Sequence, residues 1–195
     1  METVKHVFLF SGKRKSGKDY ISDRLQKRLG LDVCLILRLS GPLKEQYAKD
    51  HGLDYQELLN ASSYKEAHRA KMIKWGEDMR EANPYFFCQK TVESAAPGVP
   101  VWIVSDARRL SDVNFFKEKY PSQLKLVRIT ASEDIRKERG FIFTKGIDDA
   151  ESECGLDEGV NWDITIDNSG DESLLDQNIS SLVSLVQTQR DDTFK

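Results

Sequence analysis

Residues 12–19 read Gly-Lys-Arg-Lys-Ser-Gly-Lys-Asp, a G-x-x-x-x-G-K-D pattern that could hold phosphate. An apolar run at 4–10, predicted to be a strand, precedes the pattern, and an amphipathic helix predicted over 19–29 follows it. In that setting the glycines let backbone N–H groups turn toward a phosphate, and the helix N-terminus adds partial positive charge. The sequence therefore predicts a nucleotide-binding loop formed by Gly12, Lys13, Arg14, Lys15, Ser16, Gly17, Lys18 and Asp19.

The last residue of this loop is the one departure from the usual pattern. Asp19 stands where Ser or Thr normally donates a hydroxyl oxygen to Mg²⁺, and its carboxylate could serve the same hard cation directly or through water. Asp106, at the end of a short apolar run, is a second candidate for holding Mg²⁺ or its water; capping of the following turn is the alternative. Lys18 would reach the β- and γ-phosphates of the nucleotide.

Further basic residues follow the predicted strands. Each group alone could be a solvated surface, but all come after strand ends, where open α/β sheets bind ligands. Together they predict a pocket for more than one highly charged anion. The groups are Lys44; Lys65, Arg69 and Arg80 on one helix; Arg108 and Arg109; and Arg136, Lys137 and Arg139.

This excess of cations indicates the chemistry of the acceptor. A kinase that phosphorylates a hydroxyl needs a base, commonly an Asp in a recognisable loop. A phosphomonoester, with its second pKa near about 6, already presents an anionic oxygen at neutral pH. Its difficulty is repulsion from the γ-phosphoryl group, which Lys, Arg and Mg²⁺ relieve. The sequence therefore favours a phosphate acceptor.

Apolar strand-like runs alternate with helical patterns along the chain. Strands are predicted over 4–10, 33–39, 101–105, 124–130 and 163–167, and helices over 19–29, 42–50 and 64–82. A closing helix carries Leu175, Ile179, Leu182 and Val186 on one stripe, and a stripe of Met72, Trp75 and Met79 is expected in the core. The pattern predicts an α/β fold with a mostly parallel sheet covered by helices on both faces, in a single domain over 1–195.

Composition narrows the class of protein. The net charge of −3 divides unevenly, because residues 146–195 hold 2 basic and 13 acidic residues. Local cationic clusters on such a chain suit compact anions rather than nucleic acid. No run is long enough for a membrane span, and three scattered cysteines suggest free thiols in a reducing compartment. We therefore expect a cytosolic protein and a monomer. A peroxisomal association is the alternative, although the C-terminal Thr-Phe-Lys is not an S-K-L-type address.

Six longer stretches resemble the animal-type phosphomevalonate kinase family. They are LFSGKRKSGKD, CLILRLSGPLKEQYAKDHGLD, YKEAHRAKMIKWGE, VSDARRLSD, RKERGFIFTKGIDDAESECGLD and IDNSG, and the match spans nearly the whole chain. The resemblance implies a P-loop fold like that of nucleoside-monophosphate kinases, with an acceptor-binding region near 40–90 and a lid near 131–150. It also implies transfer of the ATP γ-phosphoryl group to 5-phosphomevalonate, in the mevalonate route to isoprenoids and sterols.

The same resemblance assigns roles to individual residues. Lys13 and Lys18 would act in γ-phosphoryl transfer, with Arg14 binding phosphates and Arg139 acting as a lid arginine helped by Arg136. Asn168 and Ser169 would lie at the adenine end of ATP. The 5-phosphate and carboxylate of the acceptor would be held by Lys44, Lys65, Arg69, Arg80, Arg108 and Arg109.

Two other classes of protein share part of this pattern. A nucleoside-monophosphate or other small-metabolite kinase would have the same fold and charge logic but a different acceptor. A GTP-dependent switch normally carries N-K-x-D for guanine, which this sequence lacks, and Asp167-Asn168-Ser169-Gly170 comes too late in the chain for a switch.

Overall fold

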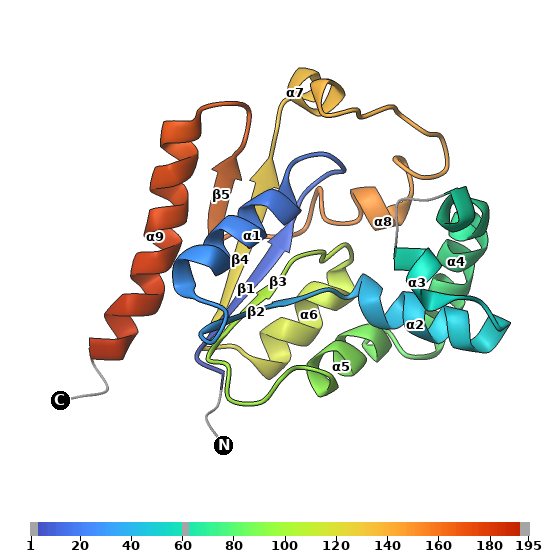
Figure 1. The fold of residues 1–195 in the computed structure, drawn as a ribbon, viewed down its shortest axis with the longest axis horizontal. Coiled ribbons are helices and arrows are strands. Elements are labelled where there is room, and N and C mark those ends of the chain that lie inside the picture. The colour runs from blue at the N-terminus through green and yellow to red at the C-terminus, as the bar shows by residue number, and fades with distance from the viewer. Residues whose placement is uncertain (1–3, 60–62, 192–195) are drawn as a thin grey trace. The chain divides into compact units, whose positions relative to one another are not determined.

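The computed structural model describes residues 4–59 and 63–191 (Figure 1). Two compact units make up the chain: Met1–Leu37 with Ala96–Lys195, and Arg38–Ala95. The first unit contains β1 (His6–Ser11), α1 (Lys18–Leu29), β2 (Cys34–Leu37), β3 (Val101–Val104), α6 (Leu110–Lys119), β4 (Leu124–Thr130), α7 (Glu133–Glu138), α8 (Glu151–Cys154), β5 (Ile164–Asp167) and α9 (Glu172–Asp191). The second unit contains α2 (Ser40–His51), α3 (Tyr55–Leu59), α4 (Ser63–Ala82) and α5 (Phe86–Glu93).

A five-stranded parallel sheet in the order β2-β3-β1-β4-β5 forms the centre of the first unit. Strand β1 lies in the middle, with Phe8 opposite Ile103 of β3 and Lys125 of β4. All strands run the same way, so the segments that follow them emerge at one edge of the sheet. The 12–19 loop, directly after β1, therefore lies between the segments that follow β3 and β4.

Apolar side chains on both faces of the sheet explain why its strands read as continuous hydrophobic runs. On one face, Phe8, Ile103 and Val127 pack with Ile21 of α1 and Leu182 of α9. The next residue along a strand points to the opposite face, where Trp102 meets Tyr120 at the end of α6, with ring centroids 5.6 Å apart. Helices thus cover both faces, as predicted. The predicted closing stripe is confirmed, since Leu175, Ile179, Leu182 and Val186 are all buried.

The second unit is helical and has a smaller core of its own. Tyr47 and Leu58 are fully buried with Met72, and Trp75 packs against them. The expectation that Met72 and Trp75 belong to the core is confirmed, whereas Met79, the third member of the predicted stripe, is only half-buried. The Trp75 and Tyr47 rings meet edge to face with their centroids 5.6 Å apart, a geometry that aromatic pairs favour.

Boundaries and short elements account for the differences from prediction. The second strand ends at Leu37 rather than at residue 39, because Leu39 already caps α2, and α2 begins at Ser40 rather than at Pro42. Helices α3, α7 and α8 span six residues or fewer, too short to show a helical period in the sequence. Over the described residues, no helix combines the length and apolarity needed to cross a bilayer.

Candidate active site

Glycines shape the predicted phosphate loop where no side chain fits. A Cβ on Gly12 would lie 2.3 Å from the Ile129 carbonyl oxygen, and one on Gly17 would lie 2.2 Å from Asn168 Nδ2. Gly17 also has a φ of 92°, and Lys15 holds a left-handed φ of 63° that side-chain-bearing residues rarely adopt. Strain of this kind gathers at functional sites, where the surrounding structure maintains it.

Lys18 is the first residue of α1, and its side chain is directed back over the loop. Its ammonium donates to the carbonyl of Gly12 and, at 3.2 Å, to that of Lys13. Burial, together with the charge of the neighbouring Arg108, lowers the pKa of Lys18 from its ordinary 10.5 to about 7. The carboxylates of Glu153, Asp106 and Asp19 oppose that shift. A phosphate arriving here would stabilise the charged form of the lysine.

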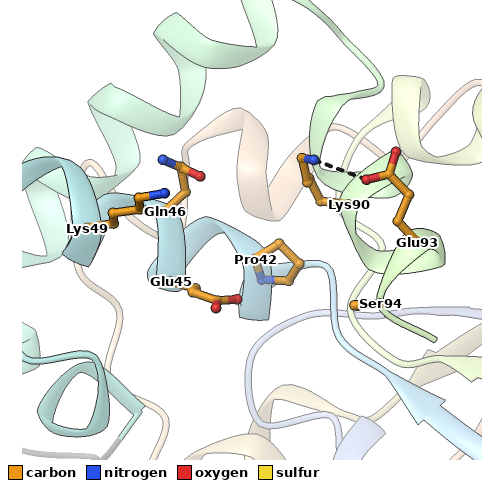
Figure 2. A pocket seen from close by; sticks show the side chains of 7 residues that line it. All are labelled: Pro42, Glu45, Gln46, Lys49, Lys90, Glu93 and Ser94. Carbon is orange, nitrogen blue, oxygen red and sulfur yellow. Dashed lines mark hydrogen bonds and ion pairs between the residues drawn. The ribbon is translucent and has the colours of Figure 1, made fainter. Parts of the chain in front are cut away.

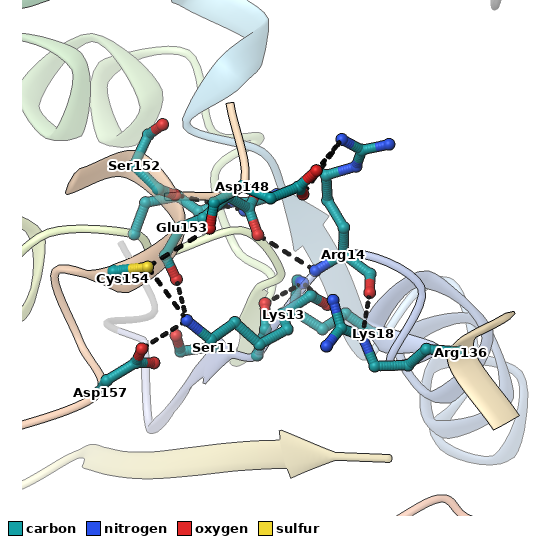
Figure 3. A network of polar contacts seen from close by, with 12 residues as sticks. Ser11, Lys13, Arg14, Lys18, Arg136, Asp148, Ser152, Glu153, Cys154 and Asp157 are labelled. Atoms are coloured by element: carbon teal, nitrogen blue, oxygen red, sulfur yellow. Dashed lines mark hydrogen bonds and ion pairs between the residues drawn. The ribbon is translucent and has the colours of Figure 1, made fainter. Parts of the chain in front are cut away.

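Lys13, the second loop lysine, lies in a network of polar contacts (Figure 3). Its ammonium forms an ion pair with Asp157 and donates to the Glu153 carbonyl at 3.0 Å and to the Cys154 sulfur at 3.3 Å. Burial raises the pKa of Asp157, but the hydrogen bonds from Lys13 and Arg128 outweigh this and leave it below its ordinary value. Asp157 therefore stays ionised beside the lysine.

Two nearly buried carboxylates hold the arginines of the site. Asp148, with its side chain 4% exposed, accepts from Arg14 Nη1 at 3.0 Å. Glu153, 7% exposed, pairs with Arg108 and also accepts from the backbone N–H of Arg14 at 3.1 Å. Buried charges are stable only when they are paired and hydrogen-bonded, as both are here.

The predicted lid arginines contact the outside of the same loop. Arg136 Nε donates to the Arg14 carbonyl at 2.7 Å, and its guanidinium lies 3.9 Å from the centre of the Phe141 ring. Arg139 donates to the Ser16 carbonyl at 3.3 Å and to the Asn168 carbonyl at 2.8 Å. Each arginine thus donates to a carbonyl of the 12–19 loop, and their predicted role in a lid stays a prediction.

Asn168 and Ser169 follow the last strand, as predicted, but their contacts differ. Asn168 is buried against the loop, where Nδ2 donates to the Ser16 carbonyl at 2.8 Å. The Ser169 hydroxyl donates to the Asp167 carboxylate at 2.6 Å and accepts from the Ser132 backbone N–H at 2.9 Å. Asn168 thereby supports the loop backbone, and their predicted place at the adenine end of ATP stays a prediction.

Arg108 and Arg109 lie at the end of the segment between β3 and α6, and their environments differ. Asp112 accepts from both backbone N–H groups, at 2.9 and 3.1 Å, and so fixes the turn. The Arg108 guanidinium reaches Glu153 beside the loop. Arg109 is buried, which lowers the pKa of its guanidinium, while Asp112 and Glu151 oppose that shift.

Asp19 and Asp106 are the two predicted metal-binding residues. Both carboxylates lie near enough to Lys18 to oppose the lowering of its pKa by burial. Within 4–59 and 63–191, no group of three or more His, Cys, Asp or Glu gathers as a protein-only metal cage. Two carboxylates beside a phosphate loop fit Mg²⁺, which takes few protein ligands and completes its shell with phosphate oxygens and water.

The other predicted acceptor cations lie in the second unit. Arg69 on α4 pairs with Glu66 at 2.8 Å, and the Arg80 guanidinium packs 4.5 Å from the centre of the Phe87 ring. Lys44 lies on α2, and Lys65 lies on α4 with its side chain outside the described part of the structure.

A polar cavity of about 380 Å³ also opens in this unit (Figure 2). Lys49 and Lys90 line it, as do Glu45 and Glu93, so positive and negative charges are balanced there. Of the predicted acceptor cations, Lys44, Arg69 and Arg80 are not among the described residues of its wall. A mixed-charge wall is a poor match for a dianion, and we assign it no role in phosphate binding.

Arg128 belongs to the site and was not predicted. It lies on β4 directly opposite Ser11, donates to the Ser11 hydroxyl at 3.1 Å and reaches Asp157 at 2.7 Å. The signal in the sequence was an arginine interrupting the apolar run LKLVRIT next to a strand end. Asp148, Glu153 and Asp157 were also missed, since an acidic stretch reads first as a solvated surface.

Comparison with known proteins identifies the family. The family model described as phosphomevalonate kinase matches residues 10–122, more than half of the chain. The chain is also 41% identical over 187 residues to a phosphomevalonate kinase of Drosophila melanogaster, covering 94% of this chain and 97% of that protein. The chain belongs to the phosphomevalonate kinase family. The resemblance noted in the sequence is thereby confirmed.

Solved structures agree on the fold of this phosphomevalonate kinase family member. A gluconokinase from Sinorhizobium meliloti 1021 aligns with a TM-score of 0.56 at 14% identity, covering 98% of this chain and 99% of that one. The Mycobacterium tuberculosis APS kinase CysC, solved with AMPPNP and APS, aligns at 0.51 and 14% identity, covering 95% and 99%. The predicted P-loop kinase fold is therefore confirmed.

Proposed function

We propose that this protein transfers the γ-phosphoryl group of ATP to the 5-phosphate of (R)-5-phosphomevalonate, giving 5-diphosphomevalonate and ADP. The observation that carries the proposal is the gathering of Lys13, Arg14, Lys18 and Arg108 around one strained glycine loop. Such a charge density suits two phosphate groups at once. Membership of the phosphomevalonate kinase family supports the choice of acceptor.

The chemistry requires little of the protein besides charge and position. One oxygen of the acceptor's 5-phosphate attacks the γ-phosphorus, the bond from that phosphorus to the β,γ-bridging oxygen breaks, and ADP leaves. The acceptor oxygen is already anionic at neutral pH, so no residue need remove a proton from it. Lys18 and Lys13 would stabilise the charge that spreads over the γ-phosphoryl oxygens in the transition state.

We propose that Arg139 adds to that stabilisation. Its guanidinium donates to the Ser16 and Asn168 carbonyls, and Ser16 lies two residues before Lys18 in the loop. We assign it the role of a lid arginine that turns from these carbonyls to the reacting phosphates, with Arg136 holding the adjacent loop carbonyl. Closure of the 131–150 region would exclude water that could otherwise hydrolyse ATP.

Mg²⁺ is the cation that such a site would use. Asp19 and Asp106 would hold it or its water, and it would supply further neutralisation of the phosphate charge. Of the residues that we propose to bind the 5-phosphate and carboxylate of the acceptor, the second unit carries Lys44, Lys65, Arg69 and Arg80, and the first unit carries Arg108 and Arg109.

The test is ADP release from ATP and Mg²⁺ by the purified protein with separate candidate acceptors. The panel comprises 5-phosphomevalonate, mevalonate and the common nucleoside monophosphates. Release with 5-phosphomevalonate alone is the expected result. Release with a nucleoside monophosphate would agree with a phosphate acceptor but would contradict 5-phosphomevalonate as the substrate. Release with mevalonate would contradict the inference that the acceptor is a phosphate.

We further propose that the enzyme is a cytosolic monomer that serves isoprenoid and sterol synthesis. Support for a monomer is that exposed large apolar side chains come from separate segments, such as Leu31 between α1 and β2 and Ile142 between α7 and α8. Light scattering on the purified protein would test this, with a mass near 22.3 kDa expected.

A further inference from the structure

Glu153 makes the contacts that a bound phosphate oxygen would make. One carboxylate oxygen accepts from the backbone N–H of loop residue Arg14 at 3.1 Å, and the other pairs with the Arg108 guanidinium. Phosphate groups in such loops are bound by the same two kinds of donor, backbone N–H groups and basic side chains. The carboxylate of Glu153 is 7% exposed, so its place among these donors is well enclosed.

The neighbours of Glu153 extend the same contacts along one short acidic segment. Asp148 binds the Arg14 guanidinium, and Asp157 pairs with Lys13 (Figure 3). The Glu153 carbonyl also accepts from Lys13 at 3.0 Å. The segment 148–157 thus supplies a carboxylate to each of three cations that we assign to phosphate binding.

The segment is built so that it could give up these contacts. Its one helix, α8, is four residues long, and much of 139–163 consists of turns. Within 139–163, all of which the structure describes, Leu156 alone has a buried apolar side chain, and segments with few buried apolar contacts open at low free-energy cost. The Arg14 backbone has a single N–H to donate, so a phosphate that takes this donor must displace Glu153 from it.

We propose that the Glu153 carboxylate is a built-in stand-in for a substrate phosphate, held by the phosphate donors of the free enzyme and displaced when ATP binds. This inference rests on the proposed role of the loop and of Arg108 in phosphate binding. Glu153 keeps the buried cations paired while the site is empty. The consequence is a lower apparent affinity for ATP, because ATP binds only to the fraction of enzyme molecules in which Glu153 has left the site.

Calorimetric titration with a non-hydrolysable ATP analogue and Mg²⁺ tests the proposal. Glu153→Gln keeps the shape of the side chain and removes its charge, and we expect the analogue to bind about 3- to 10-fold tighter. Glu158→Gln is the matched control. Glu158 is exposed in the turn after Asp157, so the same loss of charge should change the affinity less than about twofold by its field alone.

Unchanged or weaker binding by a folded Glu153→Gln protein would overturn the proposal. If that variant does not fold, Asp157→Asn takes its place. It removes the charge that pairs with Lys13 at a more exposed position, and the ATP analogue must then bind more tightly to this variant. Lys13→Met tests the role of the loop in phosphate binding separately from the stand-in role of Glu153. If it weakens binding while Glu153→Gln has no effect, only the stand-in role is lost; if neither variant has an effect, the phosphate role of this part of the loop is lost as well.

Discussion

In the first unit, the basic side chains are bound by carbonyls and carboxylates of segments anchored on a buried sheet, whereas in the second unit they lie along helices around a small core. Lys18 is buried against two loop carbonyls, and Arg14 is clamped by Asp148. Arg69, by contrast, pairs with Glu66 on its own helix, and the side chain of Glu66 is 57% exposed.

The difference indicates a division of labour. Groups fixed before the substrate arrives can stabilise developing charge without reorganising, which lowers the barrier to transfer. Groups on a separate helical unit can gather the acceptor by binding it, which acts mainly on KM. We therefore expect changes in the first unit to act chiefly on kcat and changes in the second chiefly on the KM for phosphomevalonate.

Removing the charge of Lys18 should give the largest effect. We expect Lys18→Met to lower kcat by about 1,000-fold or more, as the loss of a main transition-state charge does in other enzymes. Steady-state ADP release measures this. Lys27→Met, an exposed position on the same helix, is the control and should change kcat less than about twofold. A Lys18→Met protein with the wild-type kcat would contradict the proposed role of the first unit in phosphoryl transfer.

Removing Arg69 should affect the acceptor instead. We expect Arg69→Met to raise the KM for 5-phosphomevalonate by about 10- to 100-fold, the size of one lost charge-assisted contact, with a smaller fall in kcat. Lys71→Met, exposed on the same helix, is the matched control. A large fall in kcat at unchanged KM would show that the two units do not divide the work in this way.

The lowered pKa of Lys18 predicts a pH effect on ATP binding. With a pKa of about 7 in the free protein, Lys18 loses its charge as pH rises above 7, and bound phosphate should restore it. ATP affinity is therefore expected to fall above pH 7, by at most about tenfold per pH unit, with proton uptake on binding. Calorimetry at pH 8 in buffers of different ionisation enthalpy measures the uptake, which should vanish in Lys18→Met.

The lowered pKa of Lys18 also makes the free energy of unfolding depend on pH. Because the folded pKa lies below the ordinary 10.5, the unfolded chain binds more protons between about pH 7 and 10.5. The cost of burying the charged lysine is thus greatest below pH 7 and is relieved as pH rises through that window. Absence of proton uptake at pH 8 would contradict the buried, partly neutral lysine on which both statements rest.

Asn168 should show the smallest effect of the set. Asn168→Ala removes the hydrogen bond to the Ser16 carbonyl at 2.8 Å, and we expect the free energy of unfolding to fall by about 1–2 kcal/mol. Because the variant holds the loop less firmly, we also expect kcat/KM to fall, by less than about tenfold. Denaturant unfolding and kinetics measure the two quantities, with Asn161→Ala, an exposed position, as the control. Unchanged stability would show that Asn168 does not support the loop.

The nucleotide loop and the sheet could be predicted because their signals are local. Gly12 to Asp19 lie within one stretch of eight residues, and the strands are continuous apolar runs. Glu153 and Asp148 could not be placed from sequence, because they meet Arg14 across 139 and 134 residues and only the fold brings them together. Helix α8 was missed for a related reason, since four residues carry no helical period.

The measurement that tests the central claim most directly is phosphorus NMR of ATP, Mg²⁺ and 5-phosphomevalonate incubated with the enzyme. Transfer to the 5-phosphate predicts that its monoester resonance disappears while two new diphosphate resonances grow in equal amounts, together with those of ADP. Growth of inorganic phosphate with an unchanged monoester resonance would mean that ATP is hydrolysed rather than transferred, and would contradict the account.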